Sequence, residues 1–392
     1  MEFSDKYFDT APDRRGSGSY KWDSEAGAGD VIPLWVADMD FKTAPVVIEA
    51  LRRRFEHGVF GYTLVDDEYY AALRGWFAER HGYTIDTRQV IYTSGVVPAL
   101  SAIIKALTKP GEGVIVQTPV YNCFFSSIRN NGCRIVESPL IREEISGDTF
   151  TYRMDFEDLE RKAADPANTM LLLCNPHNPA GRIWNRDELK QVAGICSRNG
   201  VRVVSDEIHC ELAMPGLEYT PYGTIDPTGV ICLSPSKAFN TAGLQIANIV
   251  CPDDSVRRAV DRAININEVC DVNPFGVVAL KAAYSPEGAV WLNALRGYLA
   301  DNYRLTRDII SNELPGCPMA LLEATYLPWI DVSSLGVPTE ELEERLIREA
   351  GVWVNCGEMY GSGGFIRLNI ACPRERLREG LRRLVGFLKK LY

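Results

Sequence analysis

Between residues 90 and 250 the chain alternates short apolar runs with longer amphipathic segments. This alternation is typical of βα units, in which parallel strands form one sheet and the connecting helices cover its two faces. Strands are expected at residues 90–93, 113–117, 134–138, 170–174, 201–205, 230–233 and 246–250, and helices at 96–107, up to 130, at 155–164 and at 185–198. The pattern therefore predicts an α/β fold with a mostly parallel central sheet flanked by helices.

The two ends of the chain follow a different pattern. Residues 1–30 are rich in Gly, Ser and Asp and predict an irregular arm. A short strand carrying two exposed acids, Asp38 and Asp40, is expected over 32–41, before a helix over 45–56. Further helices are expected at 275–284, 287–314, 339–350 and 373–391, and short strands at 324–331, 352–354 and 365–370.

Two domains are predicted from these segments. The large domain is expected to cover residues 46–285, with a loop after residue 138 that leads to the helix at 155. The N-terminal arm (1–45) and the C-terminal part (286–392) are expected to form a second, smaller α+β domain with a shared sheet.

Composition excludes several classes of partner. A net charge of −10 and a pI near 5.1 argue against nucleic acid or an anionic membrane, because both require clustered Lys and Arg. No apolar stretch reaches transmembrane length, and eleven dispersed cysteines without a CxxC pair predict reduced thiols in a cytoplasmic protein. The histidines lack the spacing of metal-binding motifs, so no metal site is expected.

Lys237 stands between two strand-like segments, in a loop of hydroxyl and small side chains that begins at Ser234. Desolvation near buried strands destabilises an ammonium group, which makes the amine a usable nucleophile near neutral pH. Such a lysine suits a Schiff base. The alternative is a solvated loop lysine with no chemical role, and this window alone leaves both open.

Other polar or aromatic residues also follow predicted strands. They are the Ser94–Gly95 turn, Tyr121, Asn178 and Asp206. Ligands of open parallel sheets bind beyond the carboxyl ends of the strands, so these residues and Lys237 are expected to converge on one crevice. A Ser-Gly turn before a helix offers free N–H groups to a phosphate, although the same turn is common as ordinary capping.

Arg367 lies in a predicted strand among apolar neighbours. Its planar guanidinium suits bidentate binding of a substrate carboxylate, and an internal salt bridge is the alternative. A Schiff-base lysine, a strand-end aspartate, an asparagine, an aromatic ring and a phosphate seat are together the groups that hold pyridoxal phosphate. The aspartate would keep the pyridine nitrogen protonated.

The chain also resembles the fold-type I, class I/II aminotransferase superfamily of pyridoxal-phosphate enzymes. The matching motifs are Thr93-Ser94-Gly95, Pro119-Val120-Tyr121, Asn175-Pro176-His177-Asn178 with Gly181-Arg182, Ser205-Asp206-Glu207, Ser234 with Ser236-Lys237, and Phe365-Ile366-Arg367-Leu368-Asn369. Within the superfamily the chain is most similar to the MalY/PatB branch of cystathionine β-lyases, or cysteine-S-conjugate lyases. The marks of that branch are residues 35–41, 60–63, 206–209, and 237–245.

The resemblance implies a role for each matching residue. Lys237 would carry the cofactor as a Schiff base, Asp206 would pair with the ring nitrogen, Asn178 would bond the ring 3-oxygen, and Tyr121 would stack on the ring. Further cofactor-binding residues would be Gly95, Val96, His209, Ser234 and Ser236. Arg367, with Asn178 and Ala37, would bind the substrate, and Tyr62 would reach the phosphate of a neighbouring subunit, which makes the active unit a homodimer. A tyrosine in a polar turn such as 61–63 is otherwise a packing residue.

The chain departs from the aminotransferase pattern at three places. His209 replaces the usual tyrosine, Gln245 replaces the phosphate-binding arginine, and Asn122-Cys123 replaces a proline-containing run. The first two departures agree with the lyase branch, and Gln245 leaves the phosphate charge partly unneutralised. The third concerns substrate range.

The expected reaction is α,β-elimination at the Cβ–S bond of cystathionine or related cysteine conjugates, yielding thiol, pyruvate and ammonia. Lys237 would remove the Cα proton, and Lys237 or Tyr62 would protonate the leaving thiolate. Transamination between an amino acid and a 2-keto acid is the alternative, because it begins with the same proton removal. A lyase with an additional regulatory role as a protein-binding partner is a further alternative.

Overall fold

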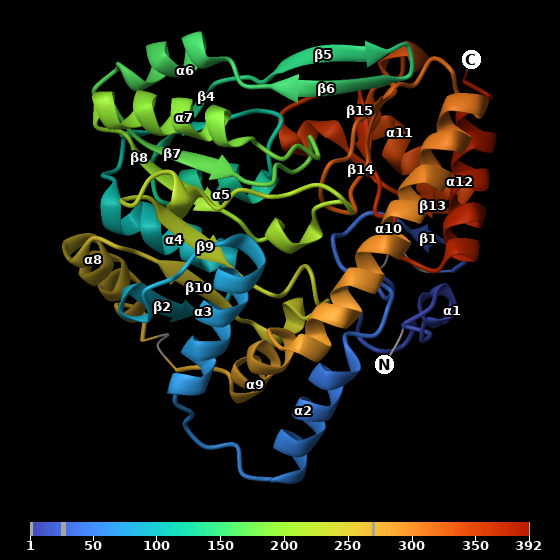
Figure 1. Cartoon of the computed structure of the whole chain (residues 1–392). Coiled ribbons are helices and arrows are strands. Elements are labelled where there is room, and N and C mark those ends of the chain that lie inside the picture. Colours follow the sequence, from blue (N-terminus) through green and yellow to red (C-terminus); the bar gives the residue numbers. More distant parts are fainter. Residues whose placement is uncertain (1–2, 25–28, 269–270, 392) are drawn as a thin grey trace.

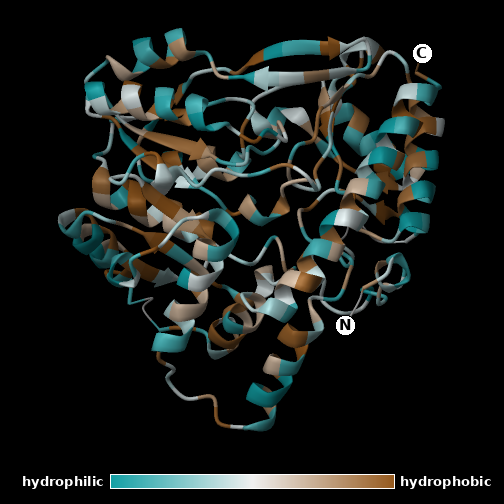
Figure 2. Ribbon diagram, in the orientation of Figure 1, coloured by the Kyte–Doolittle hydropathy of each residue, from teal (hydrophilic) through white to brown (hydrophobic). Residues whose placement is uncertain are grey.

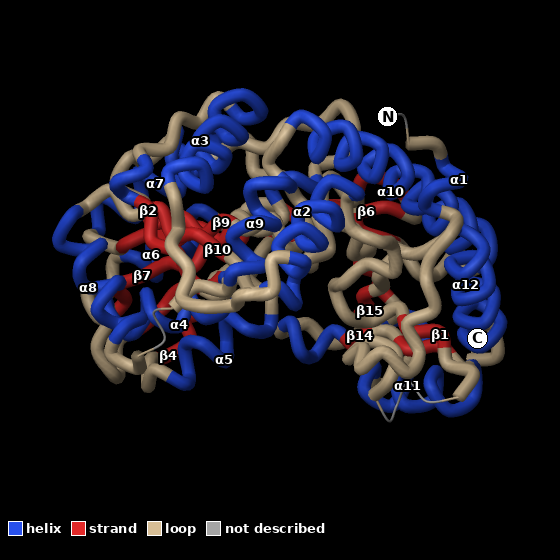
Figure 3. The backbone as a smooth tube through the Cα atoms, turned by 90° about the horizontal axis from the view of Figure 1, so that it is seen from below, coloured by secondary structure: helices blue, strands red, loops and turns tan. Residues whose placement is uncertain are grey.

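A computed structural model describes residues 3–24, 29–268 and 271–391 of the chain (Figure 1). Two sheets lie in separate halves of the molecule, and the long helix α10 (Pro286–Glu313) runs along the second half toward α12 (Arg374–Leu388) (Figures 1 and 3). No helix of the described residues is long and apolar enough to cross a bilayer.

The first half contains a seven-stranded sheet with the order β2-β10-β9-β8-β7-β3-β4. The strands are β2 (Val90–Thr93), β10 (Ala247–Val250), β9 (Val230–Leu233), β8 (Arg202–Asp206), β7 (Asn168–Cys174), β3 (Gly113–Val116) and β4 (Arg134–Glu137). Only β10 runs antiparallel to its neighbours, and the other pairs are parallel. The predicted mostly parallel α/β sheet is confirmed.

Helices cover both faces of this sheet because successive strand residues point to opposite sides. On one face α4 (Val96–Leu107), α5 (Asn122–Asn130) and α8 (Asp254–Asn265) pack on alternate strand residues such as Val114 and Leu172. On the other face α3 (Asp67–His81), α6 (Phe156–Ala163), α7 (Arg186–Asn199) and α9 (Pro274–Ala283) pack on the intervening residues. Apolar residues concentrate on the strands and polar residues on the outer helices (Figure 2).

Most predicted elements of this half form where expected, and local signals explain their ends. Helix α2 (Pro45–Glu56) begins with the predicted proline, and α7 begins with a capping box between Asn185 and Glu188. The sequence patterns did not predict α3 or α8. The start of α3 carries a clear signal, because the Asp66 side chain accepts the Tyr69 N–H at the helix N-cap.

The second half contains a six-stranded sheet with the order β14-β15-β12-β11-β6-β5. Its strands are β14 (Asn355–Cys356), β15 (Phe365–Arg367), β12 (Trp329–Asp331), β11 (Met319–Ala320), β6 (Thr149–Arg153) and β5 (Ile141–Ser146). The loop expected after residue 138 is therefore wrong in part, since β5 and β6 form a hairpin that pairs with β11. The charged sequence of β5 gives no strand signal, because an exposed edge strand needs no apolar face.

The N-terminal arm joins the second half differently from the prediction. Only β1 (Ile32–Pro33) of the expected strand over 32–41 forms, and it pairs in parallel with β13 (Val352–Trp353) as a separate two-stranded sheet. A short helix, α1 (Asp5–Phe8), also interrupts the arm. The two predicted domain boundaries stay a prediction. The hairpin at residues 141–153, which lies inside the predicted large domain, pairs with the C-terminal strand β11.

Two further expectations for the C-terminal part are corrected by backbone geometry. The expected strand over 324–331 shortens to β12, because Thr325 has a φ of 76°, a left-handed conformation that an extended strand cannot contain. The expected helix over 339–350 is α11 (Thr339–Arg345) followed by a wider helical turn, Leu346–Ala350.

Candidate active site

The predicted site residues lie after the carboxyl ends of strands that share one direction in the central sheet. Gly95 follows β2, Tyr121 follows β3, Asn178 follows β7, Asp206 ends β8, and Lys237 follows β9. Since β2, β3, β7, β8 and β9 share this direction, these side chains meet at one edge of the sheet.

Lys237 lies mostly buried in this edge, and its Nζ donates to the carbonyl oxygen of Ala37 at 2.8 Å. Burial, together with the positive charge of Arg367, lowers the pKa of Lys237 to about 8, although Asp38 and Asp206 act in the opposite direction. An amine with this pKa is partly neutral near physiological pH and is suited to act as a nucleophile or base.

Asp206 is buried at the end of β8, and its carboxylate accepts a hydrogen bond from the backbone N–H of Ile208 at 3.1 Å. Burial raises the pKa of Asp206 to about 6, against the opposing effects of that N–H and of Lys237. The carboxylate and the amine are therefore close enough to influence each other's charge, as the sequence-based proposal of one crevice requires.

Arg367 brings the second half of the molecule into the same site. Its Nη1 donates to Asn178 Oδ1 at 3.0 Å, its Nη2 donates to the Trp35 carbonyl oxygen at 3.3 Å, and the guanidinium lies over the Tyr360 ring. No carboxylate of the described residues forms an ion pair with Arg367, and its buried Nε has no hydrogen-bond partner among them. The alternative of an internal salt bridge is therefore wrong, and the buried cation can receive an anionic ligand.

His209 and Tyr121 complete the buried part of the site. Burial lowers the pKa of His209 well below its ordinary value, with further contributions from Lys237 and Arg367, and its Nδ1 has no partner among the described residues. Burial also raises the pKa of Tyr121 well above 10, and Cys123 and Asp206 add to this increase. A neutral imidazole and a neutral phenol thus face the charged groups.

The predicted phosphate seat contains hydroxyl and backbone groups. Ser234 Oγ donates to the Ile246 carbonyl oxygen at 2.6 Å and lies 2.9 Å from Ser236 Oγ. Gly95 is the N-cap of α4 and Val96 is its first residue, so the first N–H groups of a 12-residue helix point out of this end. Gln245 has an exposed side chain and a left-handed backbone with φ 53°.

Tyr62 is the predicted site residue that this single chain does not bring to the crevice. It is 95% exposed, in the segment between α2 and α3 that projects from the body of the molecule (Figure 1). Ala37 contributes its carbonyl oxygen, which accepts hydrogen bonds from both Lys237 and the Tyr326 hydroxyl.

The sequence motifs do not point to two further residues of the site, Tyr326 and Tyr360. The Tyr326 hydroxyl donates to the Ala37 carbonyl oxygen from a distant part of the chain, and the Tyr360 ring lies against the Arg367 guanidinium. Neither residue follows a strand of the central sheet or belongs to a recognisable spacing. Asp38 and Asp40 were expected to be exposed, and this is wrong for Asp40, whose carboxylate is buried against Lys21, Arg376 and Trp22.

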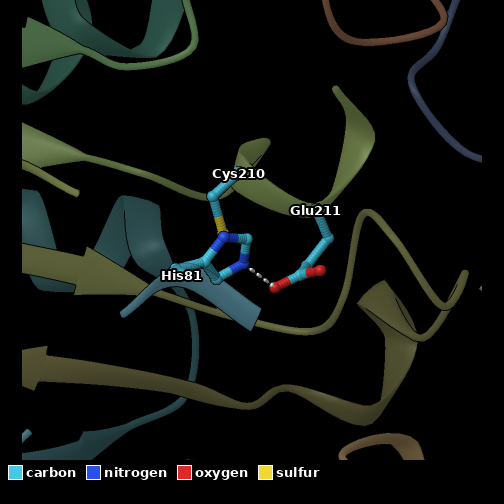
Figure 4. A group of neighbouring side chains, drawn as sticks. All are labelled: His81, Cys210 and Glu211. Atoms are coloured by element: carbon cyan, nitrogen blue, oxygen red, sulfur yellow. Dashed lines mark hydrogen bonds and ion pairs between the residues drawn. The ribbon is translucent and has the colours of Figure 1, made fainter. Parts of the chain in front are cut away.

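One cluster of the described residues has the side-chain types of a metal site: His81, Cys210 and Glu211 (Figure 4). Glu211 is already engaged, because it accepts from His81 Nε2 at 2.6 Å, from Trp76 Nε1 at 2.6 Å and from Arg80 Nε at 3.0 Å. The positive charge of Arg80 beside Glu211 would repel a metal cation bound there. The adjoining cavity of about 560 Å³ is lined by none of the predicted cofactor-binding residues, and we interpret the cluster as a buried structural network.

His177, in the turn that carries Asn178, should make the folding stability of the protein sensitive to acid. Burial lowers the pKa of His177 to about 3, from 6.5 in an exposed residue. The unfolded chain binds a proton as the pH falls through 6.5 while the folded protein does not, so folding stability is lost below pH 6.5. Between pH 7 and pH 5 the wild type should lose about 2 kcal/mol more than a His177→Gln variant.

Chemical denaturation at several pH values measures this difference directly. The control is His57→Gln, which removes an exposed histidine from the C-terminal end of α2. Equal slopes for the wild type and His177→Gln would contradict the prediction.

Comparison with known proteins places this geometry in a family. The model for aminotransferase class I and II matches residues 29–384. The chain belongs to this family. The resemblance inferred from the motifs and the fold-type I architecture are thereby confirmed.

Three relatives illustrate the range of the family near this chain. The cystathionine β-lyase PatB of Bacillus subtilis is 40% identical over 390 residues, which cover 97% of this chain and 99% of PatB. A PLP-bound putative aminotransferase from Clostridium difficile has a TM-score of 0.93 and 37% identity, covering 97% of this chain and 99% of that one. The PLP-bound C-S lyase from Staphylococcus hominis has a TM-score of 0.90 and 33% identity, covering 99% and 98%.

Proposed function

We propose that this protein is a pyridoxal-phosphate-dependent C–S lyase of the cystathionine β-lyase type. It would cleave the Cβ–S bond of cystathionine or related cysteine conjugates into a thiol, pyruvate and ammonia. The observation that carries the proposal is the pairing of Lys237, an amine with a pKa near 8, with the buried Asp206 and the unpaired Arg367 at one sheet edge. The names of PatB and of the Staphylococcus hominis lyase support it.

The residues present fit pyridoxal phosphate. Lys237 supplies the amine for the aldehyde, and Asp206 supplies a buried carboxylate for the ring nitrogen. His209 Nδ1 is buried without a partner among the described residues, as expected of a group that faces a ligand. Ser234, Ser236 and the amides at the start of α4 would hold the phosphate, and Tyr121 would stack on the ring.

When bound, pyridoxal phosphate supplies an electron sink for the negative charge that develops on the substrate Cα. Lys237, as a neutral amine, removes the Cα proton, and Asp206 holds a proton at the ring nitrogen. Arg367 and Asn178, with Ala37, bind and orient the substrate, Arg367 through the carboxylate. Lys237 or Tyr62 returns a proton to the leaving sulfur.

Product analysis tests the proposal against transamination, the reaction for which the Clostridium difficile relative is named. With cystathionine or cysteine conjugates, elimination should release pyruvate and thiol in equal amounts when no 2-keto acid has been added. Transamination would consume an added 2-keto acid and release no thiol. Rapid amino transfer without pyruvate would overturn the lyase proposal.

We also propose that the active unit is a homodimer in which Tyr62 serves the partner's site. The projecting segment between α2 and α3 exposes several large apolar side chains: Val59, Phe60, Tyr62 and Leu64. A contiguous exposed apolar segment is typical of an interface. The chain is further proposed to act in the cytoplasm, where buried free thiols such as Cys174 and Cys196 stay reduced.

Mixing two inactive variants tests this arrangement. A dimer of Lys237→Ala with Tyr62→Ala would have one site with both changes and one intact site, so an equal mixture should regain about a quarter of wild-type activity. The matched control mixes Lys237→Ala with Asp206→Ala, which act in the same chain and should regain nothing. No recovery in the first mixture would contradict a shared site.

A further inference from the structure

The segment from Trp35 to Asp40, here called the carbonyl loop, has no regular structure after β1. Its backbone oxygens nevertheless hold two residues of the proposed reaction. Trp35 O accepts from Arg367 at 3.3 Å, and Ala37 O accepts from Lys237 at 2.8 Å. The position of this loop therefore influences where both side chains lie.

The other side of the carbonyl loop is held by the N-terminal segment 14–23. Arg14 donates to both carboxylate oxygens of Asp38, at 3.0 and 2.7 Å, and also to Met39 O at 3.0 Å and Asp40 Oδ1 at 3.1 Å. Lys21, which is fully buried, donates to Asp38 O at 3.2 Å and pairs with Asp40 at 3.2 Å. Arg14 and Lys21 thus bind the same two residues of the loop, Asp38 and Asp40.

The N-terminal segment is shaped for this contact by its own turn. The Asp23 carboxylate accepts the N–H groups of Gly16, Gly18 and Ser19 at 2.8–3.0 Å. Gly16 and Gly18 have φ values of 71° and 75°, which glycine adopts at little cost. The closed turn brings Arg14 and Lys21 to the same pair of carboxylates.

The two halves of this charge cluster differ in exposure. Asp40 is fully buried and is also bound by Arg376 and Trp22, so it anchors the fold. The Arg14–Asp38 pair is partly exposed, with 20% and 26% of the side chains accessible. Asn369 and Asn240 also bond to backbone groups of the loop. Water can replace Arg14 around Asp38, so loss of Arg14 should loosen the loop at Asp38 without unfolding the protein.

We propose that Arg14 is a positioning residue of the active site: it fixes Asp38 and thereby holds the carbonyl loop where Trp35 and Ala37 orient Arg367 and Lys237. The proposal rests on the proposed function, because it assigns Arg14 to the binding of the same amino-acid substrate. The carboxylate of the substrate meets a guanidinium that is already oriented, which lowers the cost of binding.

Steady-state kinetics of the cofactor-loaded enzyme test this role. Arg14→Ala should raise KM for the cysteine conjugate about tenfold, because Arg367 loses its orientation, and should lower kcat by a smaller factor, because Lys237 loses only its contact with Ala37 O. Arg14→Lys should restore part of the loss. Arg15→Ala, which removes the exposed neighbouring arginine that lies over Trp22, should behave as the wild type.

Limited proteolysis gives a readout that does not depend on activity. Trypsin should cut after the buried Lys21 at least about tenfold faster in Arg14→Ala than in the wild type or Arg15→Ala. An unchanged KM together with unchanged cleavage would overturn the proposal, as would a loss of kcat alone. A wild type that releases no pyruvate would overturn the proposed function instead, and the cleavage rates would still decide whether Arg14 holds the loop.

Discussion

Replacing Lys237 with alanine is expected to lower kcat/KM for pyruvate release by about four orders of magnitude. The amine both tethers the cofactor and removes the Cα proton, and a positioned general base alone contributes about 10²–10⁴. The change leaves the strands on either side intact, because Lys237 lies in the loop after β9 and not in the sheet. Pyruvate release by the purified variant, supplied with excess cofactor, measures the effect.

Lys42→Ala is the matched control for this variant. Lys42 lies two residues after the carbonyl loop and is exposed, so its loss should leave kcat/KM unchanged. A Lys237→Ala enzyme with more than a tenth of the wild-type activity would contradict the assignment of Lys237.

Replacing Asp206 with asparagine should lower kcat about a thousandfold with little loss of folding stability. Asparagine keeps the shape but cannot carry the negative charge that holds a proton on the ring nitrogen, and loss of one preorganised electrostatic contact costs about 10²–10³. Because the pKa of Asp206 is raised to about 6 by burial, the neutral variant also avoids the cost of burying a charge at pH 7. Turnover and urea denaturation of the same preparation measure both effects.

The neighbouring carboxyl group, Glu207, serves as a control for the Asp206 variant. Glu207 is buried and accepts hydrogen bonds from Ser205, from the Tyr219 hydroxyl and from the Tyr222 amide, none of which is a predicted cofactor-binding residue. Glu207→Gln should therefore lower stability more than turnover. If Glu207→Gln abolished turnover and Asp206→Asn did not, the roles of the two carboxyl groups would have to be reversed.

The sequence predicted the part of the site that depends on local order. Asp206 and Lys237 follow buried strands directly, and parallel strands carry their carboxyl ends to one edge, so convergence could be inferred without coordinates. Five strands of the central sheet, β3, β7, β8, β9 and β10, were predictable because strands buried on both faces are nearly continuous apolar runs.

Contacts between distant segments could not be predicted in this way. Arg14 and Lys21 resemble surface residues of a glycine-rich arm, and only the fold shows that they bind Asp38 and Asp40. The hairpin of β5 and β6 escaped detection because its exposed edge is polar. The proposed role of Tyr62 would require a second chain, so it stays a prediction that the mixing experiment must decide.

One cofactor ring is expected to join Lys237 to Asp206 across the edge of the central sheet. Borohydride reduction of the cofactor-loaded protein, followed by peptide mass mapping, tests it most directly. The yellow colour should bleach, and the reduced cofactor should stay attached to Lys237 alone, both in the wild type and in Asp206→Asn. Label on a different lysine, or a protein that takes up no pyridoxal phosphate while Lys237 is intact, would contradict it.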